Sequence, residues 1–272
     1  MDTTTTEDKT DTPPPGSGKT YNSKFSNYFI DVDDMINGFE KIDTHDTKEK
    51  ALKQLAVIES YKSTDKNTIH SYIDTYEKLF SSIKDTTKNV LEIGIKEGGS
   101  LLLWLDYFEN AIIYGIDNKY EKRIPTNWLN KYDRIKAYNS DAYNTSFIKN
   151  EFINKNKFFD IIIDDGPHTK ESMIFTAEHY SKLLTDNGIL IIEDVQSMEW
   201  VDDIISSFPK KLQKNVKVVD LRHIKGRYDD ILIICTITPQ QVKTAVDESS
   251  NKCCYSFYRI HYKREGSNVS KM

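Results

Sequence analysis

Short apolar runs alternate with longer amphipathic stretches from residue 89 onward. Runs of this kind are typical of strands buried on both faces, and the stretches between them have helical spacing. Strands and helices that alternate in this way predict an α/β fold, with a parallel sheet covered by helices on both faces. The predicted strands are 89–93, 111–116, 134–138, 159–163 and 188–192, and the predicted helices include 100–109, 171–184 and about 197–207.

Two further apolar runs, 215–221 and 231–237, follow these five. The polar stretch HIKGRYDD between them is shorter than the dozen or more residues that a parallel crossover needs. We therefore expect a C-terminal antiparallel hairpin that completes a mostly parallel seven-stranded sheet. Ordinary dinucleotide-binding domains do not end in such a hairpin.

The composition divides the chain into four parts. Residues 1–24 contain almost no hydrophobic side chains and are expected to form a disordered tail. Residues 25–84 form an N-terminal helical segment or lid, with one helix after a capping-box sequence at 46–49 and a second over about 70–82. Residues 85–238 form the cofactor-binding core, and residues 239–272 are a C-terminal extension to which no structure is assigned.

Charge and hydropathy exclude several classes of partner. The formal net charge is −5, which argues against a nucleic-acid or membrane partner. No apolar run approaches the ~18 residues of a transmembrane helix. The chain begins without the apolar segment of a signal peptide, and its three cysteines do not form a disulfide framework. We expect a soluble, cytoplasmic protein.

In an open parallel sheet, ligands bind at the carboxyl ends of the strands. The first predicted strand leads into LEIGIKEGGS, whose glycines would let a ligand approach the backbone at the start of a helix. The spacing is not G-x-G-x-x-G, so the dinucleotide fingerprint fails. The candidate cofactor residues in this stretch are Glu92, Gly94, Gly98, Gly99 and Ser100.

Acidic residues also follow the next two predicted strands. Asp117 could accept hydrogen bonds from both hydroxyls of a ribose, and Asp141 with Ala142 is placed to meet an adenine amino group. Each of these residues could instead cap a helix or a turn. Their occurrence after three successive strands favours a nucleotide-like cofactor.

The pattern E-x-G-x-x-x-G-G, together with Asp117, Asp141 and the terminal hairpin, resembles the class I S-adenosylmethionine-dependent methyltransferases. The resemblance covers about residues 64–237, and it implies their Rossmann-like fold and S-adenosylmethionine as cofactor. The usual Gly-x-Gly of their first motif is here Gly94-Ile95-Lys96.

Several longer stretches are more specific. TDKNTIHSYIDTYEKL, YGIDN, DIIIDDGPH and LIIEDVQ are similar to the metal-dependent macrolide sugar O-methyltransferases of mycinamicin and macrocin type and to cephalosporin-hydroxylase-like proteins. In that resemblance Asp65, Lys66, His70 and Tyr72 belong to a stretch that folds over cofactor and substrate. Tyr72 could equally be a core residue.

Three carboxylates follow the fourth and fifth predicted strands: Asp165, Glu193 and Asp194. Neighbouring strands lie about 4.8 Å apart, so these acids should converge and repel one another unless a cation binds. All-oxygen ligands favour Mg²⁺ or another divalent cation. The resemblance also places these three residues at the family's metal-ligand positions. The alternative interpretation is that they are ordinary turn and cap residues.

His168 follows Asp165 across a Gly-Pro turn and could take a proton from a metal-bound hydroxyl. The resemblance places it at the family's general-base position, where the preceding residue is usually serine and here is Pro167. Arg222 and Asp230 lie in the predicted hairpin connection, where they could touch the substrate or pair with neighbouring charges.

We therefore expect a metal-dependent O-methyltransferase that uses S-adenosylmethionine to methylate a hydroxyl of a sugar, either a nucleotide-sugar, a glycan or a glycosylated metabolite. The alternatives are a catechol-type methyltransferase, a nucleotide-dependent oxidoreductase or epimerase, and a binding module without catalysis. Related enzymes are often oligomeric, which leaves a homo-oligomer open for this chain.

Overall fold

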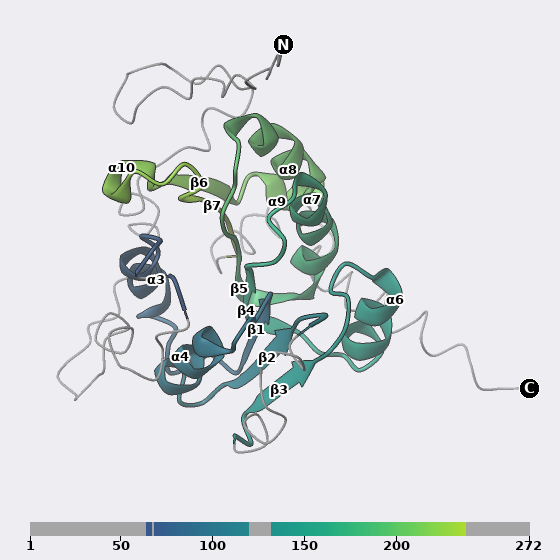
Figure 1. Ribbon diagram of the computed structural model, residues 1–272. Helices are drawn as coiled ribbons and strands as arrows, with labels where there is room; N and C mark the ends of the chain where they lie inside the picture. The colour runs from purple at the N-terminus through teal and green to yellow at the C-terminus, as the bar shows by residue number, and fades with distance from the viewer. Residues whose placement is uncertain (1–63, 67, 120–131, 238–272) are drawn as a thin grey trace, which may run out of the picture.

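The computed structural model describes residues 64–66, 68–119 and 132–237 (Figure 1). The expected disordered tail, the helix expected after residue 46 and the C-terminal extension lie outside the described residues. None of the helices in the described ranges is long and apolar enough to cross a membrane.

A seven-stranded sheet forms the centre of the fold, in the order β3-β2-β1-β4-β5-β7-β6. The first five strands are parallel, and β7 pairs antiparallel with both β5 and β6. The α/β fold with a C-terminal antiparallel hairpin is thereby confirmed. The strands are β1 Asn89–Ile93, β2 Ile112–Ile116, β3 Ile135–Tyr138, β4 Phe159–Asp164, β5 Leu184–Ile192, β6 Val216–Asp220 and β7 Ile231–Thr236.

Helices cover both faces of the sheet (Figure 1). Helices α3 and α4 pack on one face and α6 to α9 on the other, each over its own apolar cluster of buried side chains. The helices are α3 Ile73–Phe80, α4 Gly99–Tyr107, α6 Thr145–Ile148, α7 Lys170–His179, α8 Val201–Ser207, α9 Lys210–Gln213 and α10 Arg222–Lys225, with a π-helical turn at Lys149–Ile153 and 3₁₀ turns at Tyr180–Leu183 and Met198–Trp200.

Several predicted boundaries shift by a few residues, and the strand predicted at 188–192 begins at Leu184. Two differences concern helices. The helix expected over 171–184 ends at His179 and continues as a 3₁₀ turn, because β5 already begins at Leu184, which pairs with Phe159. The connection between β6 and β7 contains the one-turn helix α10, which the sequence did not predict; it closes on Gly226 in a left-handed conformation.

The register of the sheet aligns the ends of its central strands. Ile93 lies opposite Asp164, and Asp164 lies opposite Ile192. The residues that follow these three positions, Gly94, Asp165 and Glu193, therefore leave the sheet side by side.

Candidate active site

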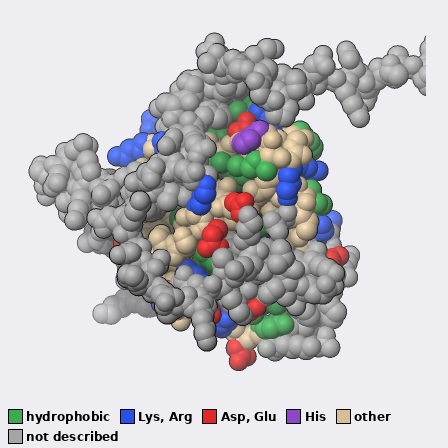
Figure 2. Space-filling view, turned by 90° about the vertical axis from the view of Figure 1, so that its left-hand side faces the viewer, with side chains coloured by type: hydrophobic (Ala, Val, Ile, Leu, Met, Phe, Trp, Pro, Cys, Tyr) green, Lys and Arg blue, Asp and Glu red, His purple; other side chains and the backbone are tan. Residues whose placement is uncertain are grey.

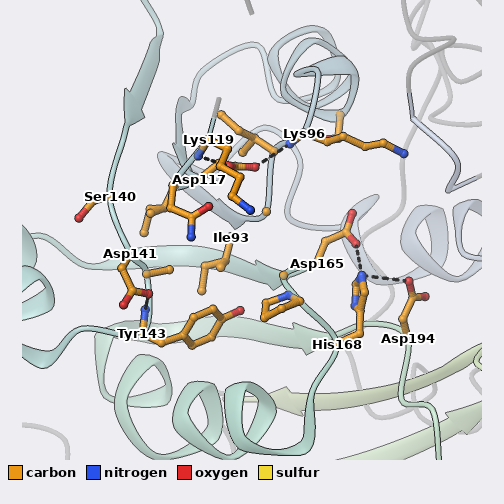
Figure 3. Close-up of a pocket in the computed structure, with 18 of the residues that line it drawn as sticks. Ile93, Lys96, Asp117, Lys119, Ser140, Asp141, Tyr143, Asp165, His168 and Asp194 are labelled. Carbon is orange, nitrogen blue, oxygen red and sulfur yellow. Dashed lines mark hydrogen bonds and ion pairs between the residues drawn. The ribbon is translucent and has the colours of Figure 1, made fainter. Parts of the chain in front are cut away.

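A cavity of about 460 Å³ lies at the carboxyl ends of β1, β2 and β4 (Figure 3). The predicted site residues that line it are Asp65, Gly94, Gly99, Ser100, Asp117, Asp141, Ala142, Asp165, His168 and Asp194. The predicted residues that do not line it are Lys66, His70, Tyr72, Glu92, Gly98, Glu193, Arg222 and Asp230. The structure thus brings together most of the predicted residues that follow the strands, although Glu193, which directly follows β5, does not line the cavity.

Other polar residues also line the cavity, among them Thr64, Lys96, Asn118, Lys119 and Tyr143, which were not predicted. Most of them are next to residues that were predicted from their position after a strand. The sequence pattern identifies the first residues after a strand, but it does not show how many residues of the following loop line the cavity.

Gly94 lets the loops after β1 and β4 approach each other. Its φ is +81°, and a Cβ atom at this position would lie 1.9 Å from the carbonyl oxygen of Asp165. The backbone N–H of Asp165 donates to the carbonyl of Ile93 at 2.8 Å. Only glycine combines this conformation with so close a contact.

Asp117 joins two loops beside the cavity. One carboxylate oxygen accepts a hydrogen bond from the backbone N–H of Lys96 at 3.1 Å, and the other accepts from that of Lys119 at 2.7 Å (Figure 3). After the neighbouring strand β3, Asp141 accepts from the backbone N–H of Tyr143 at 2.9 Å. Both acids are fixed by backbone donors while they still line the cavity.

Glu92 lies below the cavity. It is completely buried and accepts hydrogen bonds from Ser100 at 2.6 Å and from the indole N–H of Trp104 at 3.2 Å. Burial raises the pKa of its carboxyl group. Glu92 therefore secures the first turns of α4, which Gly98 begins in a left-handed conformation.

Asp164 anchors the loop that carries Asp165 and His168. Its buried carboxylate accepts hydrogen bonds from the hydroxyls of Tyr143, at 2.7 Å, and Thr176, and from the backbone N–H of Gly166 at 3.2 Å. Burial raises the pKa of Asp164 to about 6, although these hydrogen bonds act in the opposite direction.

His168 and Asp194 both adopt left-handed backbone conformations, with φ of +54° and +55°. The imidazole Nε2 lies 3.6 Å from Oδ1 of Asp165 and 3.6 Å from Oδ2 of Asp194 (Figure 3). Such conformations cost about 1–3 kcal/mol each in a non-glycine residue and concentrate at functional sites. These two uncommon backbone conformations bring the side chains of His168 and Asp194 together beside the cavity.

A buried lysine occupies the inner side of the acidic group. Nζ of Lys66 lies 2.6 Å from Oδ2 of Asp165, 2.7 and 2.9 Å from the two oxygens of Glu193, and 3.3 Å from Oε1 of Glu92. Burial alone would lower the pKa of Lys66, but the three carboxylates raise it well above its ordinary value. Burial raises the pKa of Glu193 well above its ordinary range.

Residues just before and within α3 also bind the acids. The hydroxyl of Tyr72 donates to Asp194, and that of Tyr76 donates to Glu193. His70 Nδ1 lies 2.7 Å from Oδ1 of Asp230 and 3.3 Å from Oδ1 of Asp194. Tyr72, His70 and Asp230 are thus buried around the acidic group, behind the cavity wall.

The charged residues of the β6–β7 connection form local pairs. Arg222 binds Asp220 through two side-chain hydrogen bonds of 2.9 and 2.7 Å, and Arg227 binds Asp229 at 2.7 Å. On the face seen in Figure 2, acidic and basic side chains of the described residues are interspersed.

The donor set at the acidic end of the cavity fits a hard divalent cation. Asp165, His168 and Asp194 each offer one ligand atom within 4.8 Å of the others. Two carboxylate oxygens with waters or substrate oxygens match the coordination that Mg²⁺ takes in proteins.

Comparison with known proteins agrees with these features. Residues 91–195 match the family model of a methyltransferase domain. Two relatives are an 8-demethyl-8-α-L-rhamnosyl tetracenomycin-C 2′-O-methyltransferase of Streptomyces olivaceus, 27% identical over 144 residues, and an L-olivosyl-oleandolide 3-O-methyltransferase of Streptomyces antibioticus, 26% identical over 147 residues. The matches cover 50% and 52% of this chain and 36% of each relative, so the chain spans about a third of their length.

A solved structure of the MycE methyltransferase from the mycinamycin biosynthetic pathway, in complex with Mg and SAH, has the same fold. Its TM-score is 0.54 at 19% sequence identity, over 70% of this chain and 55% of that chain. The matched segment of the family model begins inside β1 and ends just after Asp194, so it contains the glycine loop, Asp117 and the DDGPH loop. Residues 91–195 are therefore the part of this chain that is similar to a methyltransferase domain.

Proposed function

We propose that this protein is an O-methyltransferase that uses S-adenosylmethionine and a divalent cation to methylate a hydroxyl of a sugar on a small molecule. One observation carries the proposal: a single cavity connects Gly94 and Asp117 with Asp165, His168 and Asp194. A methyl donor and an acid–base group could therefore meet inside it.

The cofactor would lie over the ends of the first three strands. Gly94 and Gly99 leave room for its amino-acid part next to the start of α4, and Ser100 offers a hydroxyl there. Asp117 would accept from the ribose hydroxyls, and Asp141 with Ala142 would meet the adenine. The complex of MycE with SAH supports a cofactor of this kind.

Asp165 and Asp194 would hold the divalent cation on the cavity side. When bound, such an ion lowers the pKa of a coordinated hydroxyl and orients it. Glu193, expected from the sequence to be a third ligand, lies behind these two acids and does not line the cavity. The presence of Mg in the MycE complex supports a metal at this end.

His168 would act as the general base. Its imidazole is 26% exposed and lines the cavity, so a hydroxyl can reach Nε2. As the proton moves to Nε2, the acceptor oxygen forms a bond to the methyl carbon and the carbon–sulfur bond of the sulfonium breaks. The products are the methyl ether, S-adenosylhomocysteine and a protonated His168, which returns its proton to solvent.

A sugar acceptor is favoured by the two relatives, whose names specify rhamnosyl and olivosyl compounds. The test is mass spectrometry after incubation with trideuteromethyl S-adenosylmethionine, Mg²⁺ and a set of 6-deoxyhexose glycosides, with catechol as the comparison acceptor. We expect a gain of one trideuteromethyl group on a glycoside. Transfer to catechol alone, or no binding of S-adenosylhomocysteine in calorimetry, would contradict the proposal.

A further inference from the structure

The acidic group contains more carboxyl groups than the single ammonium of Lys66 can pair with. Four carboxylates, Glu92, Asp165, Glu193 and Asp194, gather at the ends of β1, β4 and β5, and the Lys66 ammonium contacts the first three of them. Lys66 is 1% exposed, so its charge is a fixed part of the interior. A buried ammonium of this kind requires close anionic partners.

We propose that Lys66 is the permanent cation of a two-cation centre and positions the ligands of an exchangeable divalent ion. Its ammonium would neutralise Glu193 and hold Asp165 by Oδ2, which leaves Oδ1 of Asp165 and Oδ2 of Asp194 for the ion. This inference rests on the proposed function, because it concerns the ion of the same site.

The two cations would use different oxygens. Both oxygens of Glu193 bind Nζ of Lys66, and one of them also accepts from Tyr76. Oδ2 of Asp165 binds Lys66 at 2.6 Å, whereas its Oδ1 points toward His168.

The two carboxylate oxygens of Asp194 also have different partners. Its Oδ1 accepts from Tyr72, and its Oδ2 is the oxygen nearest His168. Oδ1 of Asp165 and Oδ2 of Asp194, which face the imidazole of His168 rather than Lys66 or Tyr72, are thus both on the cavity side (Figure 3).

The backbone around Lys66 fixes it in this place. The carbonyl of Lys66 accepts from the N–H of Tyr72 at 3.2 Å, and the carbonyl of Asp65 accepts from the N–H groups of Ile69 and His70 at 3.0 Å. Asp65 lines the cavity while its neighbour Lys66 points into the acids. The same turn therefore places Asp65 in the cavity wall and the ammonium of Lys66 among the buried acids.

Replacing Lys66 with methionine removes the charge and keeps most of the side-chain volume. Titration with Mn²⁺, followed by the electron paramagnetic resonance signal of the free ion, counts bound ions. We expect one ion per chain in the unchanged protein and two in Lys66→Met, since the vacated carboxylates then form a second site. The matched control is Lys84→Met, which removes a buried ammonium 5.0 Å from the ring centre of Tyr107 and should leave one ion.

Two results would overturn the inference. One ion in Lys66→Met, bound more tightly than before, would mean that the lysine and the metal share a position. One ion with unchanged affinity would mean that Lys66 is only structural. If the unchanged protein binds no Mn²⁺ while S-adenosylhomocysteine still binds, the metal part of the proposed function fails as well.

A second pair of variants is available should Lys66→Met not fold. In Glu193→Gln the amide oxygen can still accept from Lys66 and Tyr76, and only the second contact with Lys66 is lost. The affinity for Mn²⁺ should therefore stay within about tenfold, the lower end of the effect of an outer-sphere partner. Asp194→Asn should abolish saturable binding at millimolar Mn²⁺. An equal loss in both variants would assign Glu193 to the direct ligands and contradict the two-cation arrangement.

Discussion

Nε2 of His168 lies 3.6 Å from Oδ2 of Asp194, although the two residues come from loops after different strands. Both backbones are left-handed, which is costly for residues with a Cβ atom. The two loops therefore bring an imidazole and a carboxylate to the same part of the cavity. The catalytic role that we propose for the DDGPH sequence is tested by the predictions below.

The first prediction concerns the contact between the loops after β1 and β4. Gly94→Ala should lower the free energy of unfolding by more than about 3 kcal/mol, because a methyl group would lie 1.9 Å from the carbonyl oxygen of Asp165. Gly226→Ala is the matched control: its φ is +71°, and among the described residues no atom beyond its chain neighbours lies within 4 Å of the added carbon. It should cost about 1 kcal/mol from the backbone conformation alone. Urea denaturation measures both variants, and equal losses would contradict the close approach at Gly94.

The second prediction concerns the cofactor. Asp117→Ala should weaken binding of S-adenosylhomocysteine by about 1.5–3 kcal/mol, the worth of a charged hydrogen bond. Isothermal titration calorimetry measures this change. The exposed residue Asp186 provides the control, since Asp186→Ala should bind normally. Unchanged affinity in Asp117→Ala would remove the ribose assignment.

The third prediction concerns the pH dependence of stability. The folded pKa of Asp164 is about 6 against an ordinary value of 3.8, so the folded state favours the protonated acid. The resulting stabilisation is complete below pH 3.8 and is lost as the pH rises through about 6. Between pH 5 and pH 7.5 the loss should be about 1–1.5 kcal/mol.

Asp164→Asn lacks this titration and is the control. The difference in unfolding free energy between the unchanged protein and the variant, measured in EDTA, should shift by that amount across the same pH range. A difference that does not depend on pH would show that Asp164 has an ordinary pKa.

The fold could be predicted from the sequence because the apolar runs and the length of the connections between them are both local features of the chain. Each strand is a separate apolar run, and the short connection before Ile231 excludes a parallel crossover. Positions directly after a strand, such as Asp117 and Asp165, could be assigned to the site because register fixes where a strand ends.

Contacts between distant segments could not be predicted in this way. Lys66 lies 99 residues before Asp165 and 127 before Glu193, and no spacing indicates that its ammonium binds both. The side chain of Glu193 is likewise oriented by hydrogen bonds from Tyr76 and Lys66, which belong to a distant segment and not to its own strand. Resemblance placed Lys66 beside the cofactor, whereas the structure places its side chain among the acids.

The fourth prediction concerns the base. His168→Ala should keep cofactor and metal binding and lower the rate of methyl transfer by about 10²–10⁴-fold, the usual contribution of a positioned general base. The loss should decrease at high pH, because solvent hydroxide can then take the proton. Rates from pH 6.5 to 9.5 on the glycoside identified by mass spectrometry measure this effect. A loss that stays constant over that range would assign His168 a structural role.

The last prediction concerns the role of Asp165 and the divalent cation in methyl transfer. The measurement is the rate of methyl transfer to the glycoside identified by mass spectrometry, first in EDTA and then after addition of Mg²⁺. We expect EDTA to abolish transfer, excess Mg²⁺ to restore it, and S-adenosylhomocysteine binding to survive throughout. Asp165→Ala should be inactive without chelator and should not recover with added Mg²⁺. Full transfer in EDTA by the unchanged protein, with normal activity in Asp165→Ala, would contradict a metal-dependent site at the ends of β4 and β5.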